Sequence, residues 1–452
     1  MVILGLGSNI GDRLAHLRLA LNLIKNTVNL SVKQISPIYL SDALLPENAS
    51  ASWNLPFLNI AIRCETLLTP HELLECIKKI EKQIGRTQEK YWGPRIIDID
   101  ILAWDSFVQE DKYLHIPHKN LHERPFALWP LADVAPRWIY PLKGAEFGKT
   151  AEELAIKWGS RFTGGAPLHT RQIQQRIDTP QLVGILNITP DSFSGDGYDN
   201  HVEHAVKQAH QLVAEGAEII DIGAEATGPL ATPIHSAEEI RRLEPVLKAL
   251  MPTLSSLPIR PKISIDTRYA TTAKKALAYD INWINDVSGL HDINLQKLIA
   301  EVGVEVVIMH NLGIPVSLSG LLSKAANPVS LIYEWGEKKL NTLQKAGIEK
   351  ERIIFDIGIG YGHSAEQALE LIKKISVFKN LKTRLLVGHS RKSFLKQFTE
   401  KNPNERDIET LVASLYLSHQ SVDYLRIHQV EITARAFKVA QALLDVKTFA
   451  TV

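Results

Sequence analysis

Two aspartates, Asp98 and Asp100, stand two positions apart in an apolar run, a spacing that suits metal binding. Side chains alternate along a strand, so both carboxylates project one way while Ile97, Ile99 and Ile101 project into a core. Adjacent carboxylates repel each other unless a cation lies between them. Short oxygen ligands suit Mg²⁺, which often arrives with nucleotide phosphates. The pair therefore predicts a magnesium–nucleotide site, against the alternative of two exposed edge-strand acids.

The residues before this pair strengthen that interpretation. Arg95 lies three residues upstream of Asp98 and follows Trp92-Gly93-Pro94, which predicts a stiff aromatic turn. A guanidinium binds phosphate oxygens through paired hydrogen bonds. A bare Asp-x-Asp pair is usually a solvated surface feature, but a cation and a rigid turn beside it favour phosphate binding.

Polar residues also end eight short apolar runs in the second half of the chain. In a β/α barrel the chemistry lies at the carboxyl ends of the strands. Any one of these residues alone could satisfy loop backbone groups, but eight at corresponding positions predict a site. The runs end at Asn187, Asp221, Asp266, Asn285, Met309, Asp356, Gly388 to Lys392, and Arg426 to His428.

The types of these residues indicate a flat, polar ligand. Asp266, Asn285 and Asp356 offer acceptors for a ring that carries amino and N–H groups, and Lys392 offers a donor for a ring carbonyl. A mostly apolar wall with a small number of polar groups is typical of sites for such heterocycles.

A second group of residues points to an anion. Arg426 and His428 alternate on a predicted strand, so both face one side and can clamp an anionic group. Ser390 is expected to begin a helix, where free backbone N–H groups favour a carboxylate or phosphate.

Two different arrangements of elements are expected to position these groups. The first part of the chain indicates an α+β sandwich with a mixed sheet, and the polar segment Ser41–Pro56 suggests a mobile lid. Its expected strands are Val2–Gly7, Val32–Tyr39, Phe57–Glu65 and Ile96–Trp104, and its expected helices are Arg13–Thr27, Leu68–Gly85 and Thr150–Trp158.

The second part repeats strand and helix eight times, which predicts a (β/α)8 barrel within an α/β chain. Asn327 and Ser364 are expected to cap helices. We place the domains at residues 1–160 and 179–452, with a linker at 161–178. The expected strands are Leu182–Ile188, Ala217–Ile222, Lys262–Asp266, Trp283–Asn285, Val304–Met309, Ile353–Asp356, Arg384–Val387 and Tyr424–Ile427.

Composition sets outer limits on function. A chain of 452 residues requires at least two domains, and a net charge of +1 argues against nucleic-acid binding through bulk charge. The two cysteines read as reduced thiols. Neither a membrane span nor a signal peptide is evident, so we expect a cytoplasmic protein without membrane partners.

The first ~160 residues resemble 6-hydroxymethyl-7,8-dihydropterin pyrophosphokinase, which transfers pyrophosphate from ATP to a pterin alcohol and releases AMP. The matching segments are Leu4 to Asp12, Trp92 to Asp100, Ile116-Pro117-His118 and Arg124 to Leu131. The resemblance implies a ferredoxin-like domain and two Mg²⁺ that bridge the ATP phosphates. It assigns the metal to Asp98 and Asp100, the triphosphate to Arg86, Arg95, His118 and Arg124, and the pterin to Phe57, Asn59 and Phe126.

Residues 180–445 resemble dihydropteroate synthase, which condenses the pterin pyrophosphate with p-aminobenzoate. The match rests on Gly184 to Phe193, the second strand end through Pro229, Ser390-Arg391-Lys392 and Arg426-Ile427-His428. It implies that sulfonamides compete with aminobenzoate and that the barrel forms a homodimer. The implied pterin contacts are Asp266, Asn285, Val287, Met309, Asp356, Gly388 and Lys392. The resemblance implies that Asn187, Arg426 and His428 bind the pyrophosphate, with one Mg²⁺ at Asn187. The remaining implied substrate contacts are Phe193, Asp196, Thr227 and Ser390.

The chain departs from the synthase pattern in its loops. Asp196 is displaced by one position, Gly228 replaces a loop arginine, His363 replaces a lysine, and Gln429 replaces an aspartate. Two alternatives for the barrel stay open. One is a pterin methyltransferase, which needs no pyrophosphate clamp, and the other is a pterin-binding scaffold without turnover.

Overall fold

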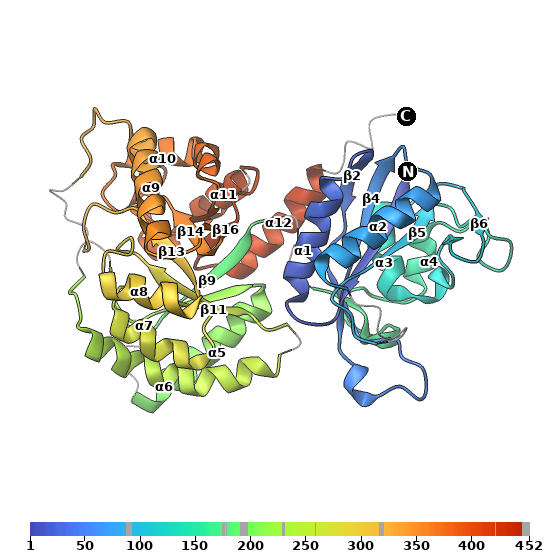
Figure 1. Cartoon of the computed structure of the whole chain (residues 1–452), viewed down its shortest axis with the longest axis horizontal. Coiled ribbons are helices and arrows are strands. Elements are labelled where there is room, and N and C mark those ends of the chain that lie inside the picture. Colours follow the sequence, from blue (N-terminus) through green and yellow to red (C-terminus); the bar gives the residue numbers. More distant parts are fainter. Residues whose placement is uncertain are drawn as a thin grey trace. The chain divides into compact units, whose positions relative to one another are not determined.

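The structure is a computed structural model, and the chain divides into two compact units, Met1–Asp178 and Thr179–Leu444 (Figure 1). Among the residues named above, Trp92, Phe193, Asp196, Gly228 and Pro229 lie outside those that it describes. Within the described ranges, no helix has the length and apolar character needed to cross a membrane. These ranges are 1–86, 93–173, 177, 179–189, 198–227, 231–257, 259–315, 321–420 and 422–444.

The first unit is built on a sheet with the order β-α-β-β-β-α-β, which is the β-α-β-β-α-β order of ferredoxin-like folds with one more strand between the helices. The strands lie in the order β5-β1-β4, with β2 and β3 both paired to β4. All described pairs are antiparallel, so the expected mixed sheet is wrong. Strands β1 and β2 do not pair with each other, because β4 lies between them and is antiparallel to both. The elements are β1 (Val2–Ser8), α1 (Arg13–Lys25), β2 (Leu30–Ile35), β3 (Tyr39–Ser41), β4 (Phe57–Thr66), α2 (Pro70–Ile84) and β5 (Asp98–Trp104).

Two sequence expectations for this sheet need correction. The single strand expected over Val32–Tyr39 is two strands, with Pro37 between them, since proline cannot donate to a ladder. Part of the expected linker, β8 (Arg171–Gln172), pairs with β3. A further small sheet joins β6 (Gln109–Glu110) to β7 (His115–Ile116).

Helices cover both faces of the main sheet. Helices α1 and α2 contact each other and β1, β2 and β5. On the opposite face, Ile3 shares a buried cluster with Trp129 and Leu131 of α3 (Pro125–Val134). Helix α4 (Ala151–Ile156) packs on α3 and begins with a capping box at Thr150.

The predicted alternation along β5 is confirmed. Ile97, Ile99 and Ile101 are buried, whereas Asp98 and Asp100 are partly exposed on the other face. Both aspartates therefore project from one side of a strand that its apolar side chains fix to the core.

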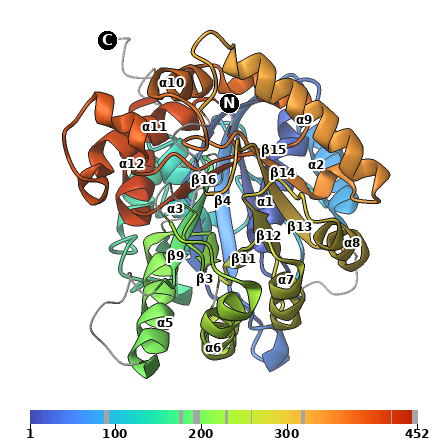
Figure 2. The ribbon, with the colours of Figure 1, turned by 90° about the vertical axis from the view of Figure 1, so that its left-hand side faces the viewer.

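The second unit is a closed barrel of eight parallel strands (Figure 2). The strand positions predicted from short apolar runs agree with the structure to within two residues at each end, as expected for strands buried on both faces. The strands are β9 (Gln181–Asn187), β10 (Ile219–Gly223), β11 (Lys262–Asp266), β12 (Trp283–Asp286), β13 (Glu305–Met309), β14 (Ile353–Asp356), β15 (Arg384–Val387) and β16 (Tyr424–Ile427).

Helices surround these strands in Figure 2. Asn327 and Ser364 accept hydrogen bonds from the first turns of α9 and α10, so both predicted caps are confirmed. The helices are α5 (Tyr198–Glu215), α6 (Ser236–Ser255), α7 (Ala270–Ala276), α8 (Ile293–Val302), α9 (Pro328–Lys345), α10 (Ala365–Lys373), α11 (Asp407–Ser418) and α12 (Val430–Leu444).

Apolar side chains fill the barrel interior below its mouth. Trp283 and Tyr424 pack edge to face with ring centroids 4.8 Å apart, in a cluster with Val183, Ile219 and Val307. The interior is therefore a packed core, and the carboxyl ends of the strands are where such barrels bind ligands.

Gly336→Ala is expected to destabilise the barrel, although alanine favours helices more than glycine. A Cβ at Gly336, in the middle of α9, would lie 2.9 Å from Leu381 Cδ1 and 3.0 Å from the Phe355 ring. Such overpacking typically costs about 1–3 kcal/mol. Urea unfolding measures the change, with the exposed Lys338→Ala on the same helix as the control. An unchanged urea midpoint would show that Leu381 and Phe355 can shift to make room for the methyl group.

Candidate active sites

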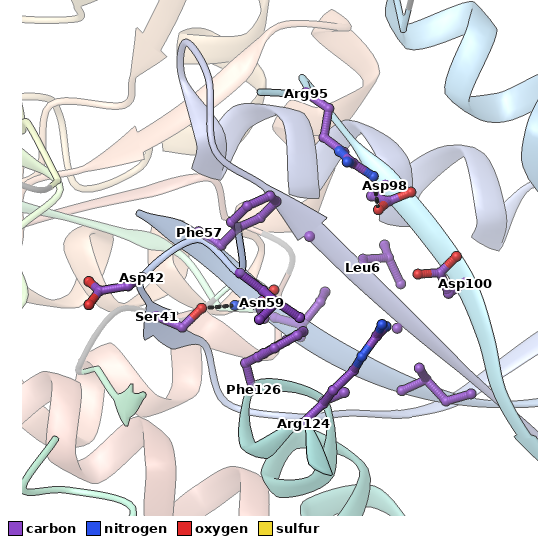
Figure 3. Close-up of a pocket in the computed structure, with 16 residues that line it drawn as sticks. Leu6, Ser41, Asp42, Phe57, Asn59, Arg95, Asp98, Asp100, Arg124 and Phe126 are labelled. Atoms are coloured by element: carbon purple, nitrogen blue, oxygen red, sulfur yellow. Dashed lines mark hydrogen bonds and ion pairs between the residues drawn. The ribbon is translucent and has the colours of Figure 1, made fainter. Parts of the chain in front are cut away.

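A pocket opens on the β-sheet face that carries Asp98 and Asp100 (Figure 3). Its volume is about 140 Å³, and its lining combines carboxylates, guanidinium groups and aromatic rings. Predicted site residues that line it are Phe57, Asn59, Arg95, Asp98, Asp100, Arg124 and Phe126. The pocket thus brings together residues from β4, β5, α3 and the connections beside them.

Asp98 lies between two arginines. Arg86 Nη1 donates to Asp98 Oδ1 over 2.6 Å, and Arg95 Nη1 donates to Asp98 Oδ2 over 2.7 Å. Burial disfavours the charged carboxylate, but both arginines outweigh it, so the pKa of Asp98 lies below its ordinary value. Asp98 is therefore ionised at neutral pH.

Asp100 lies in a different electrostatic setting. Burial and the negative charge of Asp98 raise the pKa of Asp100. His118 Nε2 lies 4.0 Å from Asp100 Oδ2, and Arg124 Nη1 lies 3.4 Å from His118 Nδ1. A carboxylate that its neighbour makes harder to ionise is stabilised by a cation shared between the two, so this pair fits a divalent metal ion.

The described residues contain no cluster of three His, Cys, Asp or Glu side chains that could hold a metal alone. Mg²⁺ usually keeps several waters and binds through one or two carboxylates together with substrate phosphates. Asp98 and Asp100 fit that mode, which requires a phosphate-bearing ligand in the pocket.

Asn59 and two phenylalanines form the other end of the pocket. Figure 3 shows the Asn59 side chain between Phe57 and Phe126 in this view. Asn59 Nδ2 donates to Ser41 Oγ over 3.0 Å, which leaves Asn59 Oδ1 as an acceptor. A Cβ at Gly7 would lie 3.1 Å from that oxygen, so glycine keeps the space beside it open.

In the barrel mouth, Arg426 links two aspartates. Arg426 Nε donates to Asp221 Oδ2 over 2.6 Å, and Nη2 donates to Asp266 Oδ2 over 2.9 Å. Asn285 Nδ2 also donates to Asp221 Oδ2, over 3.0 Å. Burial opposes the charge of Arg426, but the two aspartates outweigh it and raise the pKa of Arg426.

Lys392 and Asp356 occupy the neighbouring sector of the mouth. Lys392 Nζ donates to the Ile359 carbonyl and lies 4.6 Å from the centroid of the Tyr361 ring. Burial lowers the pKa of Lys392 to about 8, against the opposing charge of Asp356. Tyr361 and Thr227 share a 2.9 Å hydrogen bond between their hydroxyls, which joins the second and sixth strand loops.

Ser390 lies in a turn rather than at a helix start, so that expectation is wrong. The 3-10 helix after β15 begins only at Ser393, with Lys392 as its N-cap. Ser390 Oγ lies 2.9 Å from His428 Nδ1, and burial lowers the pKa of His428 to about 3. Ser390 and His428 therefore form a neutral polar pair.

The remaining predicted residues occupy different depths of the barrel. Met309 and Val287 are buried, and Asn187 is exposed at the end of β9. A Cβ placed on Gly223, the last residue of β10, would lie 3.7 Å from Asp266 Oδ2 and 3.8 Å from Asn187 Oδ1. Both oxygens therefore lie beside the carboxyl end of β10. A Cβ on Gly388 would similarly lie 3.6 Å from Asp356 Oδ2.

Two family profiles match the chain. The profile described as "7,8-dihydro-6-hydroxymethylpterin-pyrophosphokinase (HPPK)" matches residues 3–136, and that described as "Pterin binding enzyme" matches residues 183–428. A "Folate synthesis bifunctional protein" of Chlamydia muridarum (strain MoPn / Nigg) is 37% identical over 447 residues, 97% of either chain. The chain belongs to the bifunctional folate synthesis proteins.

Other relatives agree with this assignment. The mitochondrial folate synthesis bifunctional protein of Pisum sativum is 34% identical and aligns with 99% of this chain and 90% of its own. Dihydropteroate synthase of Anaplasma phagocytophilum, solved with 6-hydroxymethylpterin-monophosphate, superposes with a TM-score of 0.53 and 35% identity. That match covers 59% of this chain and 99% of the solved one. Dihydropteroate synthase of Xanthomonas albilineans, solved with 4-aminobenzoic acid, superposes with a TM-score of 0.54 and 31% identity. That match covers 59% of this chain and 94% of the solved one.

This bifunctional folate synthesis protein therefore joins a pyrophosphokinase and a dihydropteroate synthase in one chain. Sequence reasoning missed several residues of its sites. Asp221 was identified as the polar residue that ends the second apolar run, since buried parallel strands are nearly all apolar, but its partners Arg426 and Asn285 were not. The missed residues gave no comparable signal and depend on spatial neighbours. They are Gly7, Ser41, Asp42, Glu81 and Tyr361.

The substituted loop positions also have defined surroundings. His363, where the synthase pattern has lysine, is buried and stacks on His310 with centroids 5.6 Å apart. Arg391 of the Ser-Arg-Lys motif forms two hydrogen bonds with Asp407, so it stabilises the turn.

Proposed function

We propose that the first unit transfers the pyrophosphoryl group of ATP to 6-hydroxymethyl-7,8-dihydropterin and that the barrel joins this product to p-aminobenzoate. The observation that carries the proposal is the presence of two polar sites in a chain that matches bifunctional relatives over 97% of its length. We assign residues 1–160 and 179–452 to the two activities; residues 161–178, predicted as the linker, include β8 of the first unit's sheet.

In the kinase site, positioning and neutralisation of charge would supply most of the catalysis, since phosphoryl transfer needs little covalent help. Asp98 and Asp100 would hold two Mg²⁺, which neutralise the ATP phosphates when bound. Arg86 and Arg95, now paired with Asp98, could then donate to phosphate oxygens, while Arg86 keeps its ion pair with Glu81. His118 and Arg124 approach the same phosphates from beside Asp100.

The pterin would lie against Phe57 and Phe126 with one edge toward Asn59. Because Ser41 takes the amide N–H of Asn59, the free Oδ1 can accept a hydrogen bond from a ring N–H or amino group. The aromatic faces supply contact area and Asn59 supplies orientation, which suits a flat heterocycle with a hydroxymethyl arm toward the phosphates.

Gly7→Ala is expected to weaken pterin binding more than ATP binding. The new methyl would lie 3.1 Å from Asn59 Oδ1 and 3.4 Å from the Phe57 ring, where the pterin edge should lie. We expect KM for the pterin to rise about tenfold, which corresponds to roughly 1.4 kcal/mol, with KM for ATP nearly unchanged. Steady-state kinetics of AMP formation measure both values. A uniform loss in kcat alone would argue against this pterin position.

In the barrel, Asp266, Asn285 and Asp356 would accept the donors of the pterin ring and Lys392 would donate to its carbonyl. Met309 would pack on the ring, and Val287 and Gly388 would border it. Asn187, Arg426 and His428 would hold the leaving pyrophosphate with one Mg²⁺. Ser390 would receive the aminobenzoate carboxylate, and Thr227 would help to close the site together with Phe193. Phe193 and the predicted substrate contact Asp196 both lie outside the described residues.

The bond between the pterin methylene carbon and the pyrophosphate oxygen would break first, with its electron pair leaving on pyrophosphate. The resulting pterin cation is attacked by the aromatic amine, which then loses a proton. The preorganised positive charge of Arg426 at the leaving oxygen would stabilise this charge separation, and such electrostatic interactions are usually the largest contribution in an active site.

We further propose that the protein is cytoplasmic, forms a homodimer through the barrel, and binds neither nucleic acid nor membranes. The near-neutral net charge and the absence of a spanning helix within the described ranges are consistent with this proposal.

A coupled assay tests the proposed function. The full chain is supplied with 6-hydroxymethyl-7,8-dihydropterin, ATP, Mg²⁺ and p-aminobenzoate, and AMP and dihydropteroate are quantified separately. Both products should form, and omission of aminobenzoate should abolish only dihydropteroate. AMP without dihydropteroate would contradict the barrel assignment and favour a pterin-binding scaffold.

A further inference from the structure

Asp221 is a buried carboxylate that no predicted contact with substrate uses. It lies on β10 with an exposed fraction of 0%. One of its oxygens, Oδ2, accepts hydrogen bonds from Arg426 of β16 and Asn285 of β12. Oδ1 has no hydrogen-bond partner among the described residues. Asp221 therefore joins two proposed ligand-binding residues from strands far apart in the sequence.

The division of Arg426 between two aspartates is asymmetric. Asp221 accepts the hydrogen bond from Arg426 Nε, whereas Asp266, which also borders the mouth, accepts the one from Arg426 Nη2. A ligand that occupies Asp266 can displace the Nη2 bond without reaching buried Asp221. Nε would then keep the guanidinium in place while Nη2 turns to a new acceptor. A planar guanidinium suits such sharing, because its donors are fixed relative to one another.

We propose that Asp221 is a positioning residue of the synthase reaction, which orients Arg426 toward the leaving pyrophosphate and Asn285 toward the pterin. This inference rests on the proposed function of the barrel. It predicts that Asp221 acts on substrate only through Arg426 and Asn285, and that its negative charge also influences Asp266.

The charge of Asp266 provides a readout that a purely structural role would not move. Burial raises the pKa of Asp266 to about 8. Arg426 opposes this shift, whereas the carboxylates of Asp221, Glu239 and Asp286 increase it. Neutralising Asp221 removes a negative charge near Asp266. It also leaves Asp266 as the one carboxylate of the two that still forms an ion pair with Arg426. Both changes lower the pKa of Asp266, so its ionised form persists to lower pH.

Asp221→Asn is the test, because asparagine keeps the shape and one acceptor oxygen but removes the charge. Dihydropteroate formation is measured from supplied pterin pyrophosphate and aminobenzoate. We expect kcat to fall about 10²-fold, by analogy with loss of a preorganised electrostatic contact. KM for aminobenzoate and the rate of AMP formation from ATP should be unchanged. The acidic limb of the synthase pH profile should move about one unit to lower pH.

Two further variants keep the test decisive. Arg426→Lys retains the charge but cannot span both aspartates, so it should lower kcat similarly, and combining it with Asp221→Asn should add little. Glu305→Gln removes a carboxylate paired with Arg384 at the opposite end of the barrel and should leave the pH profile unchanged. If Asp221→Asn is too unstable to assay, equal kcat in Arg426→Lys and the parent chain overturns the inference.

The outcomes separate this inference from the function on which it rests. A parent chain that makes no dihydropteroate overturns both. An active parent together with an Asp221→Asn variant of unchanged kcat and pH profile overturns the positioning role alone. Loss of kcat with an unshifted profile and additive effects with Arg426→Lys also overturns it, because a structural defect alone produces that pattern.

Discussion

Asp98→Asn is expected to lower AMP formation by about 10³-fold or more, on the scale of losing a principal charge-stabilising group in a transition state. Asparagine retains the shape but loses the charge that binds a divalent cation. It also removes the ion pairs that Asp98 forms with Arg86 and Arg95, although Arg86 keeps its ion pair with Glu81. The ATP phosphates then face unbalanced positive charge without a fixed metal position. Steady-state AMP production measures the loss.

The barrel provides the internal control for this variant. Dihydropteroate formation should stop when only hydroxymethyldihydropterin and ATP are supplied, and should recover when pterin pyrophosphate is added directly. Asp105→Asn, just beyond the end of β5, removes a half-exposed carboxylate that pairs with the N-terminal amine and should leave AMP formation unchanged. Full kinase activity in Asp98→Asn would exclude Asp98 as a metal ligand.

Lys392→Met is expected to produce the converse phenotype. It should lower dihydropteroate formation about 10²–10³-fold, as loss of one preorganised donor does, and leave AMP formation intact. Methionine preserves most of the aliphatic length but cannot donate to a ring carbonyl. Separate quantification of the two products during turnover measures the effect.

The pH profile adds a second check on Lys392. Its pKa is lowered to about 8, so the ammonium form predominates below that pH and is lost above it. Synthase activity in the parent chain should therefore fall as pH rises through this range. The residual activity of Lys392→Met should lack this alkaline limb. A variant with the same limb as the parent would assign that titration to another group.

Much of the scaffold was predictable because its signals are local. Alternation in Ile97–Ile101 placed two aspartates on one face, and short apolar runs located the barrel strands. Asn327 and Ser364 were predictable caps because their side chains act on the next turn of the same helix.

The elements that were missed depend on context. Helix α3 is apolar on most sides and contains Pro130, so it carries neither a clear period of 3.6 nor a simple helix signal. β8 has two residues and owes its pairing to β3, far away in the sequence. The turn at Ser390 is fixed by contacts with His428 and Thr410 rather than by its own sequence.

The sites show the same contrast between residue type and partnership. Sequence reasoning selected Asp266 and Arg426 by type and position, but not the bond between them, since 160 residues separate the two. Asp221 was visible only as a charge in an apolar run, and its role follows from the two strands that it joins. Partner choice is thus a property of the closed barrel.

The central claim, two consecutive reactions in one chain, is tested most directly by following the terminal phosphate of ATP. The full chain is given γ-labelled ATP, hydroxymethyldihydropterin and Mg²⁺, with or without p-aminobenzoate. Without aminobenzoate, the label should accumulate on the pterin while AMP forms. With it, the label should appear in free pyrophosphate in equal amount to AMP and dihydropteroate. Label that stays on the pterin in both cases, or that appears as inorganic phosphate alongside ADP, would contradict the account.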